Sequence, residues 1–304
     1  MLIENISDLL AFREIVRQGS LSLAAKKLGI SVAVISKRLK RLESKLNISL
    51  IARSTRRLRI TEEGDKYYKH CQFILSAIEE AECEISNESK IPKGQLKISV
   101  PAYFGKLYIA PILPDFLKKY PNIGISIDFS DKFTNVIEDG YDLAVRIGNL
   151  QDSTLIAKKV AIDQRLVVAS PKYLQTFGTP RNPKELQEHN ALIFSNPSPF
   201  NLWTFFDCNN KEHNIKVQGN FETNSCESLN KAVLSGVGIA LRPKWDVWRY
   251  IENGDLIHLL TEFSPPQYNI QVVYPSRHYL PQRVSLFVEF LQHSLASETR
   301  WNNR

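Results

Sequence analysis

The sequence predicts an α/β protein with an all-α, winged-helix N-terminal domain, a long linker helix and a doubly wound α/β domain. Three observations support this architecture. The first 60 residues combine helical periodicity with two short β patterns, a long helical pattern follows, and strand and helix patterns alternate from residue 92 onward. Apolar residues at every third or fourth position indicate helices, and strict alternation indicates strands. At 304 residues the chain is long enough for two or three domains.

The N-terminal domain is predicted to open with two helices. The first begins after Ser7 or Asp8, either of which can cap it, and ends near Gln18. The second covers residues 21–28, and Gly29 follows as a typical C′ residue. These helices support the helix that comes next.

The third helix is predicted from a single apolar stripe. Ile35, Leu39, Leu42 and Leu46 fall at i, i+4, i+7 and i+11, and Ser31 precedes them as an N-cap. Two short helices joined by a tight turn containing glycine are typical of a helix-turn-helix, whose second helix enters the major groove of DNA.

Positive charge is concentrated around this third helix. Residues 36–59 contain nine of the 39 Lys and Arg residues but only one, Glu43, of the 32 Asp and Glu residues. The rest of the chain is nearly neutral, with 30 basic and 31 acidic residues. Such a concentration is typical of a polyanion site. Charge alone leaves open a basic helix face that is merely solvated.

The outer face of the third helix begins with small residues and continues with cations, which suits close approach to phosphates and base edges. Two short strands, residues 48–51 and 58–60, flank a basic segment and predict a wing. The residues expected to contact DNA are Val32, Ala33, Ser36, Lys37 and Lys40 on the helix and Arg53 and Arg56 in the wing. Val32 is suited to contact a thymine methyl group.

A long helix is predicted from Thr61 for nearly thirty residues. Its apolar stripe is narrow, and such a helix must lie along a partner, most simply a second copy of itself. Packing within the same chain is the alternative. The stripe consists of Cys71, Ile74, Ile78, Ala81 and Ile85. A dimer would present two recognition helices to an inverted repeat. The segment 87–94 contains Pro92 and Gly94 and predicts a hinge between domains.

The remainder alternates between strand and helix patterns. Strands are expected at residues 96–100, 123–129, 143–147, 238–241 and 270–274 and from residue 165, and helices at residues 113–120, 133–138, 225–235 and 282–295. This rhythm predicts a mainly parallel sheet in a first unit, a second such unit, and a C-terminal part that rejoins the first.

The stretch from Leu9 to Glu84, which ends with the long polar helix, strongly resembles the N-terminal region of the LysR-type transcriptional regulators. The matching landmarks are Gly19-Ser20, Ala24-Ala25, Leu28-Gly29, Ser36-Lys37, Leu42-Glu43, Leu50 to Arg53 and Leu58 to Gly64. The strings EDGYDLAVRIG (138–148), RLVVASPKYL (165–174) and SGVGIALRP (235–243) resemble the family's effector domain more loosely.

The resemblance implies three domains. Residues 1–60 form a winged helix-turn-helix DNA-binding domain, residues 61–91 a linker or dimerisation helix and hinge, and residues 92–304 a two-lobed effector-binding domain with a fold like that of periplasmic solute-binding proteins. Lobe 1 covers about 92–163 and 268–304, and lobe 2 about 164–267. The implied function is sequence-specific transcription regulation controlled by a small-molecule effector.

The effector is expected in the cleft between the lobes. By resemblance, the positions that border it are Ala102, Tyr103, Phe104, Arg146, Thr223 and Asn224. Backbone N–H groups that follow the first strand could hold a carboxylate, so the expected effector is a small anion such as an organic acid. The alternatives are a structural ion pair for Arg146 and core positions for Tyr103 and Phe104.

Nothing in the sequence calls for catalysis, a cofactor or a metal. The SxxK tetrad that begins at Ser228 lacks companion motifs, the glycines at 236 and 238 lack a third, and no HExxH occurs. The four cysteines have no zinc-site spacing. Some family members sense oxidants, but Cys208 and Cys226 have no activating cations beside them in the sequence, so reduced thiols are expected.

The expected partners are double-stranded DNA with a promoter inverted repeat, a small effector, further copies in a homodimer and homotetramer, and RNA polymerase. No signal peptide and no membrane span are predicted, so a cytoplasmic location is expected. The alternative is an α/β metabolic enzyme or solute-binding module whose basic N-terminus only tethers it to DNA.

Overall fold

The computed structural model describes residues 5–53, 58–85, 92–131, 136–137, 139–148, 155–195, 201–275, 280–298 and 300–301, without the side chains of 53, 73, 76 and 79–85. The chain divides into two compact units. The N-terminal unit comprises Met1–Pro92 and Asn135–Tyr141, and the C-terminal unit comprises Lys93–Thr134 and Asp142–Arg304. Within the described residues, no helix combines the length and apolar character needed to cross a lipid bilayer.

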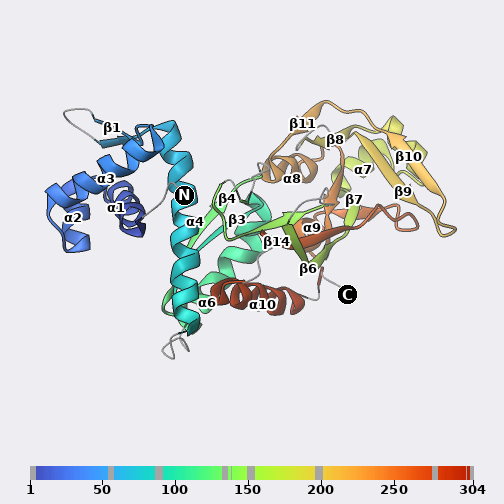
Figure 1. Ribbon diagram of the computed structural model, residues 1–304. Coiled ribbons are helices and arrows are strands. Elements are labelled where there is room, and N and C mark those ends of the chain that lie inside the picture. The colour runs from blue at the N-terminus through green and yellow to red at the C-terminus, as the bar shows by residue number, and fades with distance from the viewer. Residues whose placement is uncertain are drawn as a thin grey trace. The chain divides into compact units, whose positions relative to one another are not determined.

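The N-terminal unit is a helical bundle with a two-stranded wing (Figure 1). Its elements are α1 (Ile6–Gln18), α2 (Leu21–Leu28), α3 (Val32–Leu46), β1 (Ile51–Arg53), β2 (Leu58–Ile60) and α4 (Glu62–Ile85). Leu9, Phe12, Ile35 and Leu39 are at most 1% exposed and form the centre of its core. The apolar spacing of the sequence therefore becomes the packed inner face of each helix.

Helix caps follow the sequence signals at α3 but not at α1. The Ser31 hydroxyl accepts a hydrogen bond from the Val34 N–H at 3.3 Å, which confirms the predicted cap. At α1 the cap is Asn5, so the prediction of Ser7 or Asp8 was wrong. Asp8 lies inside the helix and is buried, where its carboxylate binds the Arg41 guanidinium of α3. This tertiary contact takes priority over local capping.

The first wing strand lies three residues later than predicted. It pairs antiparallel with β2, with Ile51 opposite Ile60, instead of covering residues 48–51. The N–H groups of Leu50 and Ile51 donate to the Glu43 carboxylate, so the preceding residues form the turn out of α3. The segment 54–57 lies outside the described residues.

The amino-terminal half of α4 packs within its own unit. The Phe12 ring lies 5.9 Å from the Tyr67 ring and 6.2 Å from the Tyr68 ring, measured between centroids, and Cys71 and Leu75 are buried in the same core. For Cys71 the alternative of packing within the chain is therefore the correct one. The side chains of Ala81 and Ile85 lie outside the described residues.

Within its described residues, the C-terminal unit contains two five-stranded sheets and a hairpin (Figure 1). We call lobe 1 the part built on the sheet of order β4-β3-β5-β14-β6, and lobe 2 the part built on the sheet of order β11-β8-β12-β7-β13. The strands are β3 (Gly94–Val100), β4 (Ile123–Phe129), β5 (Leu143–Ile147), β6 (Leu155–Asp163), β7 (Arg165–Ala169), β8 (Ala191–Phe194), β9 (Leu202–Phe206), β10 (Glu212–Lys216), β11 (Phe221–Thr223), β12 (Ile239–Pro243), β13 (Ile257–Leu259) and β14 (Tyr268–Pro275).

Helices cover these sheets. A continuous helical run in lobe 1 consists of α5 (Ala102–Phe104), η1 (Gly105–Ile109), η2 (Ala110–Ile112) and α6 (Leu113–Lys119), and the others are α7 (Pro171–Phe177), η3 (Pro183–Glu188), α8 (Cys226–Leu234), α9 (Lys244–Glu252) and α10 (Gln282–Ala296). The sequence did not predict α7, α9 or the β9–β10 hairpin. The helix predicted at 133–138 falls largely outside the described residues.

Both sheets are mixed, which corrects the prediction of a mainly parallel sheet. In lobe 1, β3 pairs parallel with β4 and β5, but β14 pairs antiparallel with β5 and β6. The cause is that the chain crosses from lobe 1 to lobe 2 between β6 and β7 and returns before β14. A strand that returns from the other lobe enters the sheet from the opposite end.

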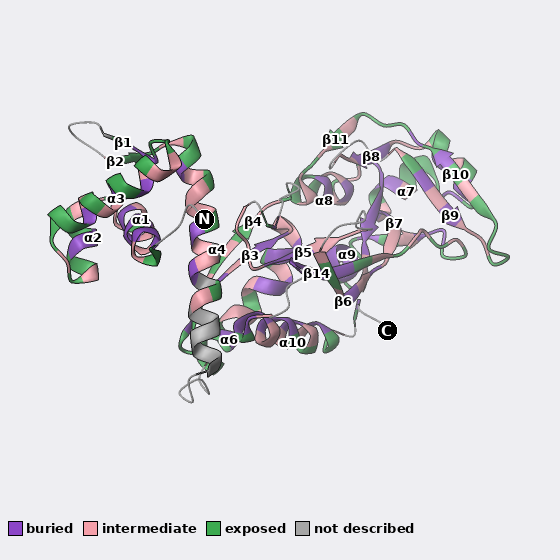
Figure 2. Ribbon diagram, viewed as in Figure 1, coloured by how far each residue is buried: buried purple, intermediate pink, exposed green. Residues whose placement is uncertain are grey.

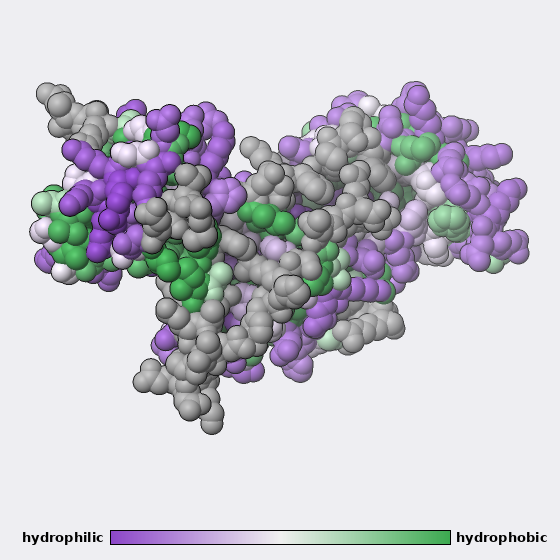
Figure 3. Space-filling view, in the orientation of Figure 1, coloured by the Kyte–Doolittle hydropathy of each residue, from purple (hydrophilic) through white to green (hydrophobic). Residues whose placement is uncertain are grey.

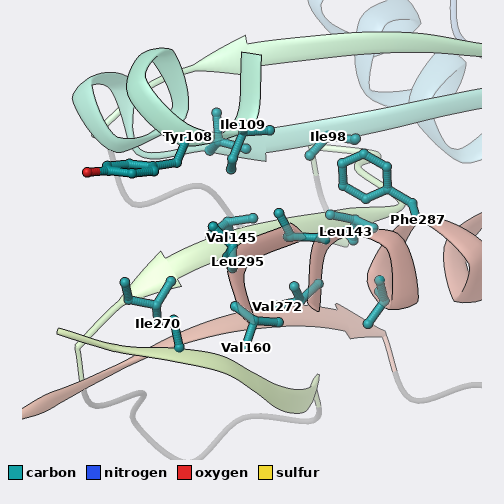
Figure 4. Packing of buried hydrophobic residues seen from close by; sticks show 14 of the residues in the cluster. Ile98, Tyr108, Ile109, Leu143, Val145, Val160, Ile270, Val272, Phe287 and Leu295 are labelled. Atoms are coloured by element: carbon teal, nitrogen blue, oxygen red, sulfur yellow. The ribbon is translucent and has the colours of Figure 1, made fainter. Parts of the chain in front are cut away.

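The hydrophobic core of lobe 1 extends to α9, and lobe 2 has core clusters of its own. Figure 4 shows side chains of β5, β14, η1 and α10 converging inside lobe 1. Trp245 and Trp248 of α9, which follows a lobe 2 strand, belong to the same cluster. The Tyr108 hydroxyl donates to the Trp245 carbonyl at 2.6 Å and accepts from Trp248 Nε1 at 3.0 Å. Trp301, 1% exposed, stacks edge-on against Tyr108. Helix α9 therefore joins the lobes through packed aromatic rings.

Burial raises the pKa of three tyrosines, so that they ionise only at high pH. Desolvation raises the pKa values of Tyr67, Tyr103 and Tyr108 to about 12, because burial disfavours the phenolate. A raised native pKa means that these groups stabilise the fold below about pH 10, their unfolded value, and that this contribution is lost as pH rises through 12. We expect part of the tyrosinate absorbance to form in denaturant, but not in native protein, at pH 11. Coincident native and denatured titration curves would contradict this.

Candidate nucleic-acid interface and effector site

Helix α3 has one buried face and one exposed face (Figure 2). Ile35, Leu39 and Leu42 are buried. On the other side Val32 is 45% exposed. The remaining predicted contact residues on this face are Ala33, Lys37 and Lys40, which are exposed, and Ser36, which is half-buried. The space-filling view shows hydrophilic residues gathered on the N-terminal unit (Figure 3). The structure therefore brings the five predicted helix residues together on one accessible face.

Basic residues of α3 have different environments. Arg41 reaches back to α1, where its Nε donates to Asp8 Oδ2 at 2.7 Å and a second bond joins the same carboxylate. This pair fixes how α3 sits on α1, so Arg41 has a structural role. Lys37 and Lys40 remain on the outer face with Val32. The Arg53 side chain and Arg56 lie outside the described residues, and their predicted contacts with DNA stay predictions.

Replacing Lys37 by alanine is expected to weaken binding to cognate DNA and to lower its dependence on salt. Each phosphate contact contributes about 0.9 to the slope of log affinity against log salt concentration, so the slope should fall by about that amount. The measurement is a salt titration of DNA affinity by fluorescence anisotropy. Lys184→Ala, which removes an exposed lysine of lobe 2, is the control. A slope equal to the wild-type slope would remove Lys37 from the phosphate contacts.

The predicted effector residues of lobe 1 have different environments. The Ala102 N–H, proposed as a carboxylate donor, already donates to Asp131 Oδ1 at 2.9 Å. Phe104 is 0% exposed and packs edge-on against Trp245 and Trp301. Its side chain therefore belongs to the core, which is the alternative that the sequence left open for Phe104. The cause is its place on the inner side of the helix that starts at Ala102.

Tyr103 reaches from lobe 1 toward lobe 2. It is half-buried, and its ring lies 6.3 Å from the Trp245 ring of α9, measured between centroids. Arg146 stays within lobe 1, where its guanidinium donates to Ser99 Oγ at 3.1 Å and to the Val145 carbonyl at 2.8 Å. Of the two, Tyr103 is the residue that links the lobes.

The lobe 2 residues lie at the start of α8. Thr223 is half-buried at the end of β11, and its hydroxyl accepts a hydrogen bond from the Ser225 N–H at 3.1 Å. Asn224 is exposed and directly precedes Ser225, the N-cap of the helix. The Lys106 ammonium of lobe 1 lies 3.4 Å from the Glu227 carboxylate of α8. The start of α8 therefore faces the helical run that begins at Ala102.

A buried polar cluster beside Tyr103 was missed by sequence reasoning. Asn230 Nδ2 donates to Asp246 Oδ1 at 2.7 Å, and Arg242 Nε donates to Asn230 Oδ1 at 3.1 Å. Arg242 and Asp246 also form a direct ion pair, with side chains 2% and 0% exposed. A signal was present in the sequence, because Arg242 and Asp246 carry opposite charges four residues apart. We call Asn230, Arg242 and Asp246 the buried triad.

The cysteine environments differ between the two predicted thiols. Cys226 begins α8 next to the buried triad, and burial raises the pKa of its thiol. A raised pKa lowers the population of the thiolate, which is the nucleophile in oxidation and disulfide exchange. Cys208 is exposed, and both are free thiols in this structure.

A small pocket lies where the chain crosses between the lobes. It is lined by Arg165, Leu202, Thr204, Leu241, Pro265, Pro266 and Tyr268. Arg165 lies 5.0 Å above the Tyr268 ring and 3.3 Å from the buried Asp163 carboxylate. None of the predicted effector residues lines this pocket, so it is separate from the site around Tyr103.

Comparisons with known proteins match both units. Residues 6–65 match the model of the bacterial regulatory helix-turn-helix protein, lysR family, and residues 89–296 match that of the LysR substrate binding domain. The chain is 38% identical to an uncharacterized HTH-type transcriptional regulator of Haemophilus influenzae over 93% of this chain and 98% of the relative. It is 36% identical to the HTH-type transcriptional regulator DmlR of Escherichia coli over 96% and 94%.

Solved structures give the same relationship. The structure of CrgA, a LysR-type transcriptional regulator from Neisseria meningitidis, superposes with a TM-score of 0.61 at 34% identity. That match covers 96% of this chain and 99% of CrgA.

Proposed function

This chain belongs to the LysR family of bacterial transcriptional regulators, and we propose that it recognises an inverted repeat in double-stranded DNA through α3 helices from two copies. It is a transcriptional regulator with a helix-turn-helix DNA-binding domain and an effector-binding domain, as its sequence predicted. The observation that carries the proposal is the exposed α3 face, where Val32, Lys37 and Lys40 lie opposite the buried side chains Ile35, Leu39 and Leu42.

The proposed role of each residue in DNA contact follows from the chemistry of its side chain. Lys37 and Lys40 supply charge for phosphates or guanine edges, and Val32 offers a methyl-rich contact for thymine. Arg53 and Arg56 of the wing add phosphate contacts. Because one helix-turn-helix reads only a half-site, we propose a dimer, with Ile78 and Ile85 of α4 in the dimer contact and a tetramer built from two such dimers.

The proposed effector is a small organic anion bound where the two lobes meet. Ala102, Tyr103, Arg146, Thr223 and Asn224 are the proposed bordering residues. What supports this location is the packing of the Tyr103 ring against Trp245, the residue that directly precedes Asp246 of the buried triad. An effector that moves Tyr103 would change the contact between lobes, and regulation requires such a difference in affinity between two lobe arrangements. We propose no catalytic step, and we expect the protein in the cytosol with its DNA.

A footprint on the DNA upstream of the protein's own gene tests the regulator against the rival interpretation of a tethered enzyme or solute-binding module. Protection of one inverted repeat, lost in an excess of that repeat but not of scrambled competitor, supports the regulator. Uniform protection along the fragment would favour the rival.

A thermal-shift screen of metabolites tests the effector class. Ligand that binds the folded state raises the melting temperature in proportion to the logarithm of its concentration above Kd. Stabilisation by carboxylates, with no effect of the corresponding amides or amines, supports an organic anion. Stabilisation by neutral or cationic compounds alone would rule that class out.

A further inference from the structure

Glu43 is the one acidic residue in the basic stretch 36–59, and its carboxylate is held by backbone donors. Glu43 Oε1 accepts hydrogen bonds from the Leu50 N–H at 2.9 Å and from the Ile51 N–H at 3.2 Å. The Ser49 hydroxyl donates to the same oxygen at 3.4 Å. A carboxylate that accepts several N–H groups is a strong, charge-assisted anchor. Glu43 thus connects α3 to the first strand of the wing.

The start of α4 holds the same segment from its other side. The Thr61 hydroxyl donates to the Ser49 carbonyl at 2.9 Å, and the Thr61 N–H donates to the Leu50 carbonyl at 3.0 Å. The Gly64 N–H in turn donates to the Thr61 hydroxyl at 2.9 Å. Residues 49–51 therefore connect α3, the wing and α4, and we call this group of contacts the wing anchor.

We propose that Glu43 is a positioning residue for DNA binding, which fixes the wing against α3 so that cations on both elements reach one duplex together. The inference rests on the proposed DNA-binding function. A carboxylate close to phosphates repels them, so the negative charge of Glu43 by itself weakens DNA binding. Glu43 favours DNA binding only if holding the wing in place strengthens binding by more than this repulsion weakens it. The geometry supplies that role, because Glu43 satisfies two N–H groups at the point where the chain leaves α3 for the wing.

The direction in which DNA affinity changes distinguishes a positioning role of Glu43 from a simple effect of its charge. If Glu43 were only a surface charge, both Glu43→Ala and Glu43→Gln would strengthen DNA binding. If it positions the wing, Glu43→Ala should weaken binding to the operator roughly tenfold, which corresponds to ~1.4 kcal/mol. Glu43→Gln should bind at least as well as wild type, because it keeps an acceptor oxygen and loses the repulsive charge. Affinity measured for Glu43→Ala equal to or above that of Glu43→Gln would overturn the proposal.

Glu43→Asp provides a second test, which remains informative if the Glu43→Ala variant is destabilised. It keeps the charge but is one methylene shorter, so positioning predicts weaker DNA binding, whereas a charge effect predicts wild-type affinity. Ser44→Ala, at the exposed neighbouring position of α3, is the matched control. A Glu43→Asp variant that binds as wild type would count against positioning.

We also expect Glu43 to influence DNA affinity through the wing. In a background with Arg53→Ala and Arg56→Ala, Glu43→Ala should weaken DNA binding clearly less than it does alone, because the wing has already lost the two cations proposed to contact DNA. Full additivity of the three substitutions would overturn the proposal.

Hydrogen exchange of the free protein tests the wing anchor independently of DNA. Glu43→Ala should accelerate exchange of the Leu50 and Ile51 amides, and Ser44→Ala should not. Unchanged exchange would overturn the wing anchor. A different result is that Glu43→Ala accelerates exchange but the wild-type protein does not select operator DNA. That result would refute the proposed function, while the wing anchor would still be supported.

Discussion

Replacing Arg242 by alanine is expected to destabilise the C-terminal unit by about 3–5 kcal/mol, the range for breaking one side of a buried ion pair. Asp246 would keep a charge in a site where its side chain is 0% exposed, and Asn230 would lose the donor to its carbonyl oxygen. An exposed ion pair contributes about 1 kcal/mol or less, so the buried setting decides the magnitude.

Tryptophan fluorescence measures this effect without interference from the DNA-binding part. All four tryptophans, Trp203, Trp245, Trp248 and Trp301, lie in the C-terminal unit and are buried. The urea midpoint reported by fluorescence should fall strongly for Arg242→Ala and stay unchanged for Lys231→Ala, an exposed position of α8. The double variant Arg242→Met with Asp246→Leu should recover part of the loss, since it removes both charges. A midpoint shift for Arg242→Ala as small as that of the control would contradict the triad's role.

Replacing Gly64 by alanine is expected to destabilise the N-terminal unit by about 1–3 kcal/mol, the range for overpacking. The added Cβ would lie 2.1 Å from the Leu50 carbonyl oxygen and 2.9 Å from Ile60 Cγ1. A backbone carbonyl cannot rotate away as a side chain does, so α4 must shift from the wing anchor. Helix propensity alone predicts the opposite sign, because alanine is favoured over glycine by about 1 kcal/mol in a helix.

Far-ultraviolet circular dichroism and tryptophan fluorescence together locate this change. The helical signal of Gly64→Ala should show a transition at lower urea than in wild type, while the fluorescence midpoint stays the same. Glu63→Ala, the exposed neighbour on α4, is the matched control and should move neither transition appreciably. An increase in stability for Gly64→Ala would mean that helix propensity outweighs the close approach to Leu50.

The sequence predicts local features of this fold better than long-range ones. Ser31 as the cap of α3 and Gly29 after α2, with φ of 66°, follow from residue chemistry within a few positions. Asp8 carries the same local capping signal as Ser31, but a partner 33 residues away, Arg41, decides its role. Only the folded chain shows that contact.

The effector region illustrates the same limit. The sequence places Phe104 in the link between the first strand and a helix but cannot show that its side chain meets α9, and α9 itself carries no strong local signal. The buried triad joins residues of α8, β12 and α9, so its existence depends on the topology of lobe 2. The sequence predicts the buried and exposed sides of α3 more reliably, because the apolar stripe of an amphipathic helix determines both sides at once.

The specificity ratio of DNA binding tests the central claim most directly. The affinity for the protein's operator is divided by the affinity for a scrambled duplex of equal length and composition, at one salt concentration, for wild type and for a variant with Val32→Ala, Ser36→Ala and Lys37→Ala. Recognition through the α3 face predicts a high wild-type ratio that falls toward one in the variant, with residual non-specific binding retained. A variant ratio equal to the wild-type ratio would show that sequence is recognised elsewhere in the chain.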